Sequence, residues 1–253
     1  MFSESDGYER FMGRWSRRLA PLFVTFAGVT EGDRVLDVGS GTGALAVAAA
    51  AIESVQVTGI EPSPAYMRYA REHVGRGARF EVGDARALPF SDDAFDRTLS
   101  MLVLNFVPDP AAALQQMIRV TRPGGVVAAA VWDYGDEMQM LRTFWDATVA
   151  IDPDAAPRDE RHMPLSTRGA LADLWQTHRL RDIHERPLSI ETAFGSFDDY
   201  WRPFLCGQGP AGVYVSSLSA SARRTLEANL RERLGDDGFA LRARAWAVRG
   251  VVT

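Results

Sequence analysis

Lysine is absent from this chain of 253 residues, so all 28 of its basic residues are arginine. Schiff-base catalysis and phosphate-binding P-loops both use a lysine amine, and the sequence therefore excludes both. Cys206 is the single cysteine, which excludes a disulfide within the chain and a metal cluster held by cysteines. We accordingly predict no metal site.

Long apolar runs and targeting signals are also missing. No apolar stretch reaches the length of a membrane-spanning helix, and residues 1–10 are polar and acidic, unlike a secretory signal peptide. The formal net charge of −5 argues against nucleic-acid binding. These features predict a cytoplasmic protein with no nucleic-acid partner and no membrane insertion, and they leave its oligomeric state open.

A glycine-rich turn is the most informative feature that is present. An apolar run containing Asp37 leads into three glycines at alternate positions, and an alanine-rich segment that favours a helix follows at residues 44–51. The three are Gly39, Gly41 and Gly43. Because glycine lacks a Cβ atom, a ligand can approach the backbone N–H groups at the start of this helix. The pattern predicts a nucleotide-type cofactor site.

Two further carboxylates follow the next two apolar runs. Glu61 ends the run at residues 55–60, where a carboxylate can accept hydrogen bonds from both hydroxyls of a ribose. Asp84 follows the run at residues 78–82, where it can accept from an adenine amino group. The glycine spacing also satisfies a loose dinucleotide fingerprint, so a nicotinamide cofactor is the alternative.

In order along the chain, these residues resemble the class I S-adenosylmethionine-dependent methyltransferases with a type 11 methyltransferase domain. Their core is most similar to the ubiquinone and menaquinone biosynthesis methyltransferases. The resemblance covers residues 31–134. It rests on the glycine loop, Glu61, Gly83-Asp84, Phe95-Asp96 before a strand, and Arg122-Pro123-Gly124-Gly125 before another. It implies S-adenosylmethionine as the cofactor and S-adenosylhomocysteine as its product.

We expect the cofactor to be held by the glycine loop, by the ends of the next strands and by an N-terminal helix that acts as a lid. Core packing is the alternative for Met67 and Leu102. The expected cofactor-binding residues are Tyr8, Arg14, Asp37, Gly39, Ser40, Gly41, Gly43, Glu61, Pro62, Met67, Gly83, Asp84, Ala85, Met101 and Leu102.

Strands and helices are expected to alternate along the chain. This pattern predicts an α/β fold with a Rossmann-like, seven-stranded, mostly parallel sheet, helices on both faces and a mostly helical cap. The expected strands are 34–38, 55–60, 78–82, 95–101, 126–132, 180–192 and 239–251. The expected helices are 8–27, 43–52, 63–74, 109–121, 136–151, 166–178 and 219–234.

We expect a single methyltransferase domain over residues 1–253. Within it, residues 1–30 form the helical lid, residues 31–134 the cofactor-binding core, and residues 135–253 the cap and the last strands. The first helix is expected to bury one face. That face comprises Phe11, Trp15, Leu19, Leu22, Phe23 and Phe26.

Methyl transfer requires little side-chain chemistry, because the protein mainly positions the acceptor, excludes water and in some cases removes a proton. The candidate catalytic residues are His162, in a polar loop, and Tyr134, after the fifth strand. Several aromatic residues favour an apolar or aromatic acceptor, with core packing as the alternative. They are Trp132, Phe144, Trp145, Trp201 and Phe204.

The sequence therefore predicts a methyltransferase that acts on a small molecule, by O- or N-methylation. One alternative is a protein of the same fold that binds S-adenosylmethionine without methylating, as a regulator or as the catalyst of another reaction. The other is an NAD(P)-dependent oxidoreductase, against which the positions of Asp84 and of Arg122-Pro123-Gly124-Gly125 count.

Overall fold

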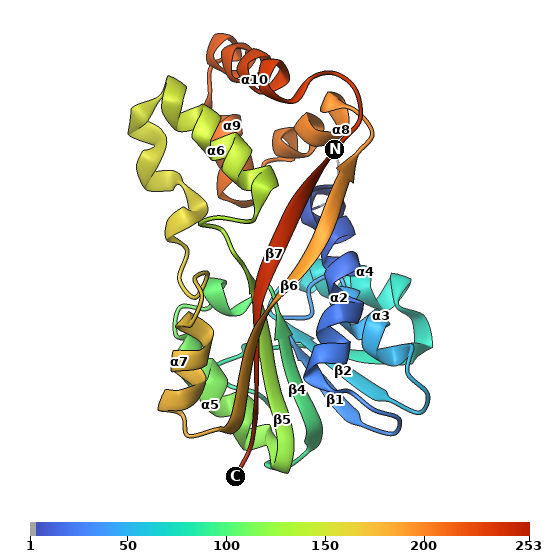
Figure 1. Ribbon diagram of the computed structural model, residues 1–253. Coiled ribbons are helices and arrows are strands. Elements are labelled where there is room, and N and C mark those ends of the chain that lie inside the picture. The colour runs from blue at the N-terminus through green and yellow to red at the C-terminus, as the bar shows by residue number, and fades with distance from the viewer. Residues whose placement is uncertain (1–3) are drawn as a thin grey trace.

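A single seven-stranded sheet organises the chain in the computed structural model, which describes residues 4–253. The strand order is β3-β2-β1-β4-β5-β7-β6 (Figure 1). Strands β1 to β5 are parallel, and β7 runs antiparallel between β5 and β6. The strands are β1 Arg34–Val38, β2 Gln56–Glu61, β3 Ala78–Val82, β4 Phe95–Met101, β5 Thr121–Trp132, β6 Arg181–Phe194 and β7 Phe239–Val251. The predicted mostly parallel, seven-stranded sheet is confirmed.

Helices cover both faces of the sheet, as expected for parallel strands joined by crossovers. On one face lie α2 (Arg14–Ala27), α3 (Ala44–Ala50) and α4 (Pro64–His73), and on the other lie α5 (Pro110–Val120) and α7 (Ala170–Thr177) (Figure 1). Single 3₁₀ turns span Gly75–Gly77 and Leu104–Phe106. The central strand β1 is almost fully buried between the two layers, as Val35, Leu36 and Val38 illustrate, whereas the edge strands β3 and β6 are partly exposed.

The cap is built on the far half of the β6–β7 pair. These strands pair along their whole length, whereas β5 pairs only with Ala245–Val251 of β7, so the pair extends beyond the sheet (Figure 1). The extended end of the β6–β7 pair leads into the cap. The cap elements are α6 (Gln139–Ile151), α8 (Phe197–Trp201), α9 (Gly209–Ser217), α10 (Ala220–Leu234) and 3₁₀ segments Pro153–Arg158, Glu160–His162 and Arg202–Cys206.

The N-terminal helix differs from the single helix expected over residues 8–27. A short helix α1 (Glu4–Tyr8) is followed by a π-helical turn (Glu9–Gly13) and then by α2. Leu22, expected on the buried face, is 42% exposed because it lies at the edge of the apolar stripe. Residues 1–3 of the expected lid lie outside the described residues.

Two other elements, β5 and α7, begin at residues that differ from the predicted ones, and glycines lie at both boundaries. Strand β5 begins at Thr121 rather than near residue 126, because Thr121 already pairs with Phe95 of β4; Arg122-Pro123-Gly124-Gly125 then interrupt the pairing, which resumes at Val126. Helix α7 begins at Ala170 rather than near residue 166, because Gly169 precedes it with a φ of +88°. Among the described residues, no helix is long and apolar enough to cross a membrane.

Candidate functional site

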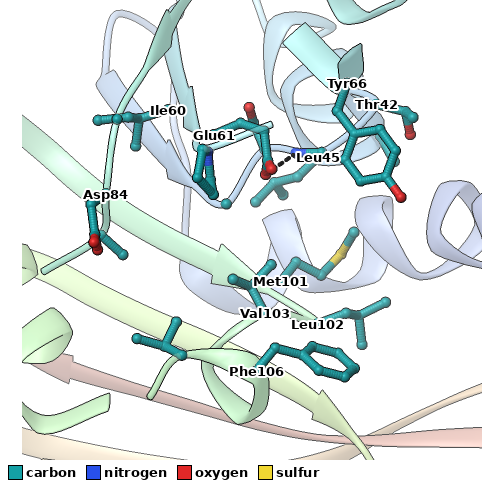
Figure 2. A pocket seen from close by; sticks show the side chains of 18 of the residues that line it. Thr42, Leu45, Ile60, Glu61, Tyr66, Asp84, Met101, Leu102, Val103 and Phe106 are labelled. Atoms are coloured by element: carbon teal, nitrogen blue, oxygen red, sulfur yellow. Dashed lines mark hydrogen bonds between the residues drawn. The ribbon is translucent and has the colours of Figure 1, made fainter. Parts of the chain in front are cut away.

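A cavity of about 500 Å³ opens at the carboxyl edge of the parallel strands. Ligands of open α/β sheets bind at this edge, where the strand order reverses between β1 and β4. The side chains of Glu61 and Tyr66 face those of Met101 and Phe106 across it (Figure 2). Its wall includes Tyr8, Gly39, Ser40, Gly41, Thr42, Leu45, Glu61, Pro62, Tyr66, Gly83, Asp84, Ala85, Arg86, Met101, Leu102, Val103 and Phe106. The volume lies within the range of cofactor sites.

The glycine loop has the backbone conformation that only glycine adopts without strain. Gly39, Gly41 and Gly43 all have positive φ angles, of 75°, 52° and 93°. A Cβ atom on Gly39 would collide with Val103, whereas one on Gly41 would meet no atom within 4 Å. Gly41 is therefore the open position at which a ligand can touch the backbone.

Glu61 joins the end of β2 to this loop. Its Oε2 accepts a hydrogen bond from the Gly41 N–H at 3.2 Å, and its Oε1 accepts from the Ser63 N–H at 3.0 Å (Figure 2). The loop backbone also reaches β2, since the N–H groups of Gly39 and Ser40 both donate to the Ile60 carbonyl. The backbone N–H groups of Gly41 and Ser63 therefore hold the Glu61 carboxylate at the cavity wall.

Asp37 lies beneath the loop and does not line the cavity. Burial raises the pKa of its carboxyl group to about 8, with a further contribution from the negative charge of Glu61. Its Oδ2 has no hydrogen-bond partner among the described residues. Asp37 is thus largely protonated at neutral pH, and its carboxyl group accepts a hydrogen bond from the Ala46 N–H of α3.

Asp84 stands on the opposite side of the cavity from the glycine loop, after β3. The Arg86 side chain binds its carboxylate, with an Nη2–Oδ2 distance of 2.6 Å, and the Arg86 N–H also donates to it at 2.8 Å. These hydrogen bonds lower the pKa of Asp84 to about 2. Asp84 is therefore an acceptor at any physiological pH, although its side chain is 47% exposed.

Leu102 has a backbone conformation that is rare for residues other than glycine. Its φ is 65°, in a region that costs about 1–3 kcal/mol for such residues. Its N–H donates to the Ala130 carbonyl of β5 at 2.7 Å, which holds the turn after β4 in place. The side chain lines the cavity beside Met101.

Several residues expected at the cofactor do not reach this cavity. Met67 is 1% exposed and packs in the core beneath α4, which is the alternative stated for it. Arg14 points to the cap, where the Asp199 carboxylate binds it at 2.8 and 3.0 Å. Gly43 serves the loop from outside the wall, since its Cβ position faces Val74. The expected roles of Met67 and Arg14 are corrected accordingly.

A second cavity, of about 150 Å³, lies beside the first. The two share Tyr8, Tyr66, Leu102 and Phe106 in their walls. The rest of its wall comes from the N-terminal segment, the end of β5 and the cap. These residues are Phe11, Met12, Trp132, Tyr134, Leu141, Glu160, Gln208, Gly209 and Pro210. An apolar cavity of this size accommodates about one six-membered ring.

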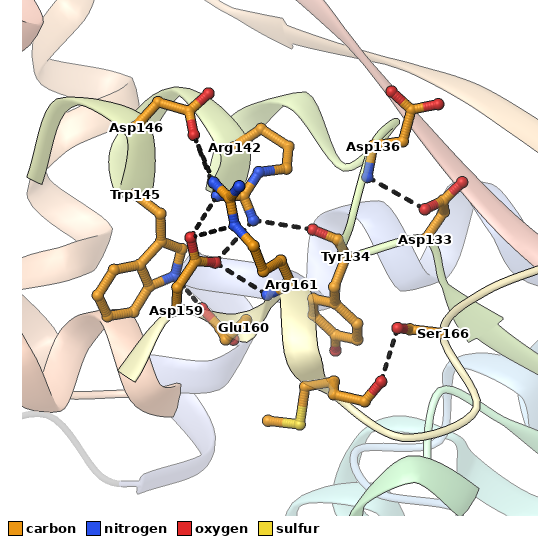
Figure 3. Close-up of polar contacts among 11 residues, drawn as sticks. Asp133, Tyr134, Asp136, Arg142, Trp145, Asp146, Asp159, Glu160, Arg161 and Ser166 are labelled. Carbon is orange, nitrogen blue, oxygen red and sulfur yellow. Dashed lines mark hydrogen bonds and ion pairs between the residues drawn. The ribbon is translucent and has the colours of Figure 1, made fainter. Parts of the chain in front are cut away.

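Arg142 of α6 holds two parts of this wall together (Figure 3). Its guanidinium donates to both oxygens of Asp159, at 2.7 and 2.8 Å, and to the Tyr134 carbonyl at 3.0 Å. A buried, bidentate pair of this kind fixes geometry as well as charge. Arg142 thus links Asp159, the residue before Glu160, to Tyr134. The side chains of Glu160 and Tyr134 both line the second cavity.

Glu160 is a buried carboxyl group, 5% exposed, and the sequence pattern did not indicate it. The Trp145 Nε1–H donates to its Oε2 at 2.8 Å (Figure 3). Burial raises the pKa of Glu160 to about 7, against the lowering effect of this hydrogen bond. Burial, together with the nearby charge of Glu160, also raises the pKa of Tyr134.

His162, the predicted catalytic histidine, is exposed and lines neither cavity. The polar loop that suggested it does reach the site, but through Glu160, because Asp159 and Trp145 turn that residue inward. Of the aromatic residues expected near an acceptor, Trp132 lines the second cavity. Phe144, Trp145 and Phe204 pack against one another in the cap core instead.

Comparison with known proteins identifies the family of the chain. The methyltransferase domain family matches residues 36–129. An uncharacterized methyltransferase of Mycobacterium sp. is 36% identical over 179 residues, which cover 67% of this chain and 69% of that protein. The chain therefore belongs to the S-adenosylmethionine-dependent methyltransferases, and S-adenosylmethionine is its cofactor.

Other relatives are similar over shorter stretches. An uncharacterized protein of Mycobacterium tuberculosis is 34% identical over 142 residues, 55% of this chain, and the match spans about half (52%) of that relative's length. The 2-methyl-6-phytyl-1,4-hydroquinone methyltransferase of Synechocystis is 37% identical over 120 residues, which cover 47% of this chain and 38% of that enzyme. The predicted similarity to quinone-type methyltransferases is confirmed for the core.

Solved structures share the fold. Phosphoethanolamine N-methyltransferase 2 of Haemonchus contortus, determined in complex with S-adenosylhomocysteine, superposes with a TM-score of 0.60 at 19% identity. The match covers 98% of this chain and 56% of that enzyme.

The donor set of the larger cavity fits S-adenosylmethionine. Gly41 leaves the loop open where a ligand would approach, and the Ser40 hydroxyl is buried without a partner among the described residues. Two carboxylates, Glu61 and Asp84, stand on different walls, as a ribose and an adenine amino group require. The remaining wall is largely apolar and suits the adenine ring.

Proposed function

We propose that this methyltransferase transfers a methyl group to the oxygen or nitrogen of a small molecule held in the second cavity. The observation that carries the proposal is the shared wall: Tyr8, Tyr66, Leu102 and Phe106 border both the cofactor cavity and its smaller neighbour. A molecule in the smaller cavity would lie next to the cofactor.

In the larger cavity, we assign the ribose to Glu61, the adenine to Asp84, Ala85 and Pro62, and the remainder to the glycine loop with Met101 and Leu102. S-adenosylmethionine supplies a methyl group that is already activated on a sulfonium. The chain's own contribution is to position the acceptor and to exclude water. Tyr8 suits this role because it lies over both cavities, 5.6 Å from the Tyr66 ring between centroids.

The division into a lid (residues 1–30), a core (31–134) and a cap (135–253) is part of the proposal. The lid contributes Tyr8 to both cavities, and the cap contributes Glu160 to the smaller one. The cytoplasmic location expected from the sequence stays a prediction.

Turnover tests the proposal. Purified protein is incubated with S-adenosylmethionine and a library of small hydroxyl and amine compounds, and S-adenosylhomocysteine is measured by mass spectrometry. We expect acceptor-dependent product for compounds that fit the second cavity, and less product after Leu141→Trp, which fills that cavity. Cofactor binding without turnover for any compound would favour the alternative of a binding protein that does not methylate.

A further inference from the structure

We infer that Glu160 is the general base of this enzyme and that the group it deprotonates is the hydroxyl of a single-ring aromatic acceptor. The inference rests on the proposed function, because it assumes that the acceptor occupies the second cavity. It goes further in naming the base, the acceptor class and the atom that is methylated.

The position of Glu160 supports the assignment first. Among the described residues, it is the one carboxylate in the wall of the second cavity. Trp145 occupies Oε2, while Oε1 accepts no hydrogen bond from any described residue. A carboxylate held through one oxygen presents the other in a fixed direction, as a base must when it takes a proton in the transition state.

The surroundings hold Glu160 in place independently of any ligand. The preceding residue, Asp159, is bound by Arg142 on one side and by the Arg161 N–H on the other. Arg142 also binds the Tyr134 carbonyl, so one side chain holds both the segment that carries the base and the aromatic wall (Figure 3). The short segment 159–161 is therefore anchored at several points rather than being a free loop.

The walls of the cavity define the acceptor. Rings of Tyr8, Tyr66, Phe106, Trp132 and Tyr134 line a space for about one six-membered ring. Aromatic side chains pack favourably on an aromatic ligand. A neutral hydroxyl group also avoids placing a second cation beside the sulfonium, which an ammonium group would do.

The protonation behaviour of the group suits this role. Burial raises the pKa of Glu160 to about 7, so ionised and neutral forms coexist near neutral pH. A base with a pKa near the working pH is the most effective kind. In the reaction, the oxygen–methyl bond forms as the sulfur–methyl bond breaks, the sulfur keeps the electron pair, and the hydroxyl proton passes to Oε1 of Glu160.

Phenol and anisole make a matched pair of probes, since anisole carries a methyl group where phenol carries its hydroxyl proton. By calorimetry on protein saturated with S-adenosylhomocysteine, we expect phenol to bind more tightly than anisole, and more tightly at pH 8 than at pH 6. Glu160→Gln should remove this pH dependence and leave anisole unaffected. Phenol that binds no better than anisole, or benzylamine that binds better than phenol, would overturn the assignment.

Turnover gives the second readout. With phenol and S-adenosylmethionine, the rate should rise through pH 7, and Glu160→Gln should lower it at least 100-fold, the usual contribution of a general base. Trp145→Phe removes the hydrogen bond that lowers the pKa of Glu160, so the rising limb should move to higher pH. Wild-type turnover in Glu160→Gln would refute the role of Glu160.

A third measurement separates the inference from the proposed function. S-adenosylmethionine should bind wild type and Glu160→Gln equally, because Glu160 does not line the cofactor cavity. If the wild type does not bind S-adenosylmethionine, the proposed cofactor site is refuted. Intact cofactor binding together with either refuting result above would refute the role of Glu160 alone.

Discussion

Replacing Asp37 with asparagine should stabilise the protein at high pH and change it little at low pH. Asp37 is buried, and the pKa of its carboxyl group is raised from 3.8 to about 8 in the folded protein. The folded state therefore holds the proton that the unfolded state releases above pH 4. By linkage, this group lowers the free energy of unfolding progressively between about pH 4 and pH 8.

The magnitude follows from the size of the pKa shift. A difference of one pKa unit corresponds to about 1.4 kcal/mol, so the wild type should lose roughly 3–4 kcal/mol relative to Asp37→Asn between pH 5 and pH 8. This figure is an upper value, because local relaxation around a buried charge reduces it. Asparagine has the same size and can still accept the hydrogen bond from the Ala46 N–H, so any other effect of the substitution should not vary with pH.

The assay is urea unfolding of both proteins at pH 5, 6, 7 and 8, without cofactor. Subtracting the unfolding free energy of the wild type from that of Asp37→Asn at each pH cancels the contributions of all other titrating groups. Asp154→Asn, which replaces an exposed carboxylate, is the matched control and should give a small, constant difference. If the difference in unfolding free energy between wild type and Asp37→Asn were also constant with pH, the carboxyl group of Asp37 would have its ordinary pKa in the folded protein. That result would refute the prediction.

Three further predictions concern the site. Glu61→Ala and Asp84→Ala should each weaken S-adenosylmethionine binding by about 1–3 kcal/mol in calorimetry, since each removes hydrogen bonds to a charged acceptor, and exposed Glu53→Ala should not. Gly39→Ala should lower the melting temperature more than Gly41→Ala, because only the former adds a collision with Val103 to the backbone strain; equal values would contradict the loop geometry. His162→Ala should keep full turnover in the acceptor assay, and a large loss would restore the histidine as a candidate base.

The cofactor half of the site could be predicted because its signals are local. In a parallel sheet, every strand ends at the same edge, so Glu61 at the end of β2 and Asp84 after β3 lie at the same edge as the glycine loop. Glycine at positions 39 and 41 permits the positive φ angles that the loop adopts there. The alternation of strands and helices along the chain independently predicts that the cofactor site lies at this edge of the sheet.

The acceptor half could not be predicted, because its contacts join distant segments of the chain. Glu160 faces inward because Trp145 and Arg142, on another element, bind it and its neighbour. Arg14 points to the cap because Asp199, 185 residues later in the chain, binds it. Neither partnership leaves a periodic signal in the sequence, so the same loop suggested His162 instead of Glu160.

The function of this chain depends most directly on which cofactor its larger cavity binds. Calorimetric titration of the purified protein with S-adenosylmethionine, S-adenosylhomocysteine and NAD(H) in parallel tests it in one measurement. We expect micromolar binding of the first two, reduced by Glu61→Ala, and no binding of the third. Binding of NAD(H) alone, or binding of S-adenosylmethionine unaffected by both Glu61→Ala and Asp84→Ala, would contradict the site described.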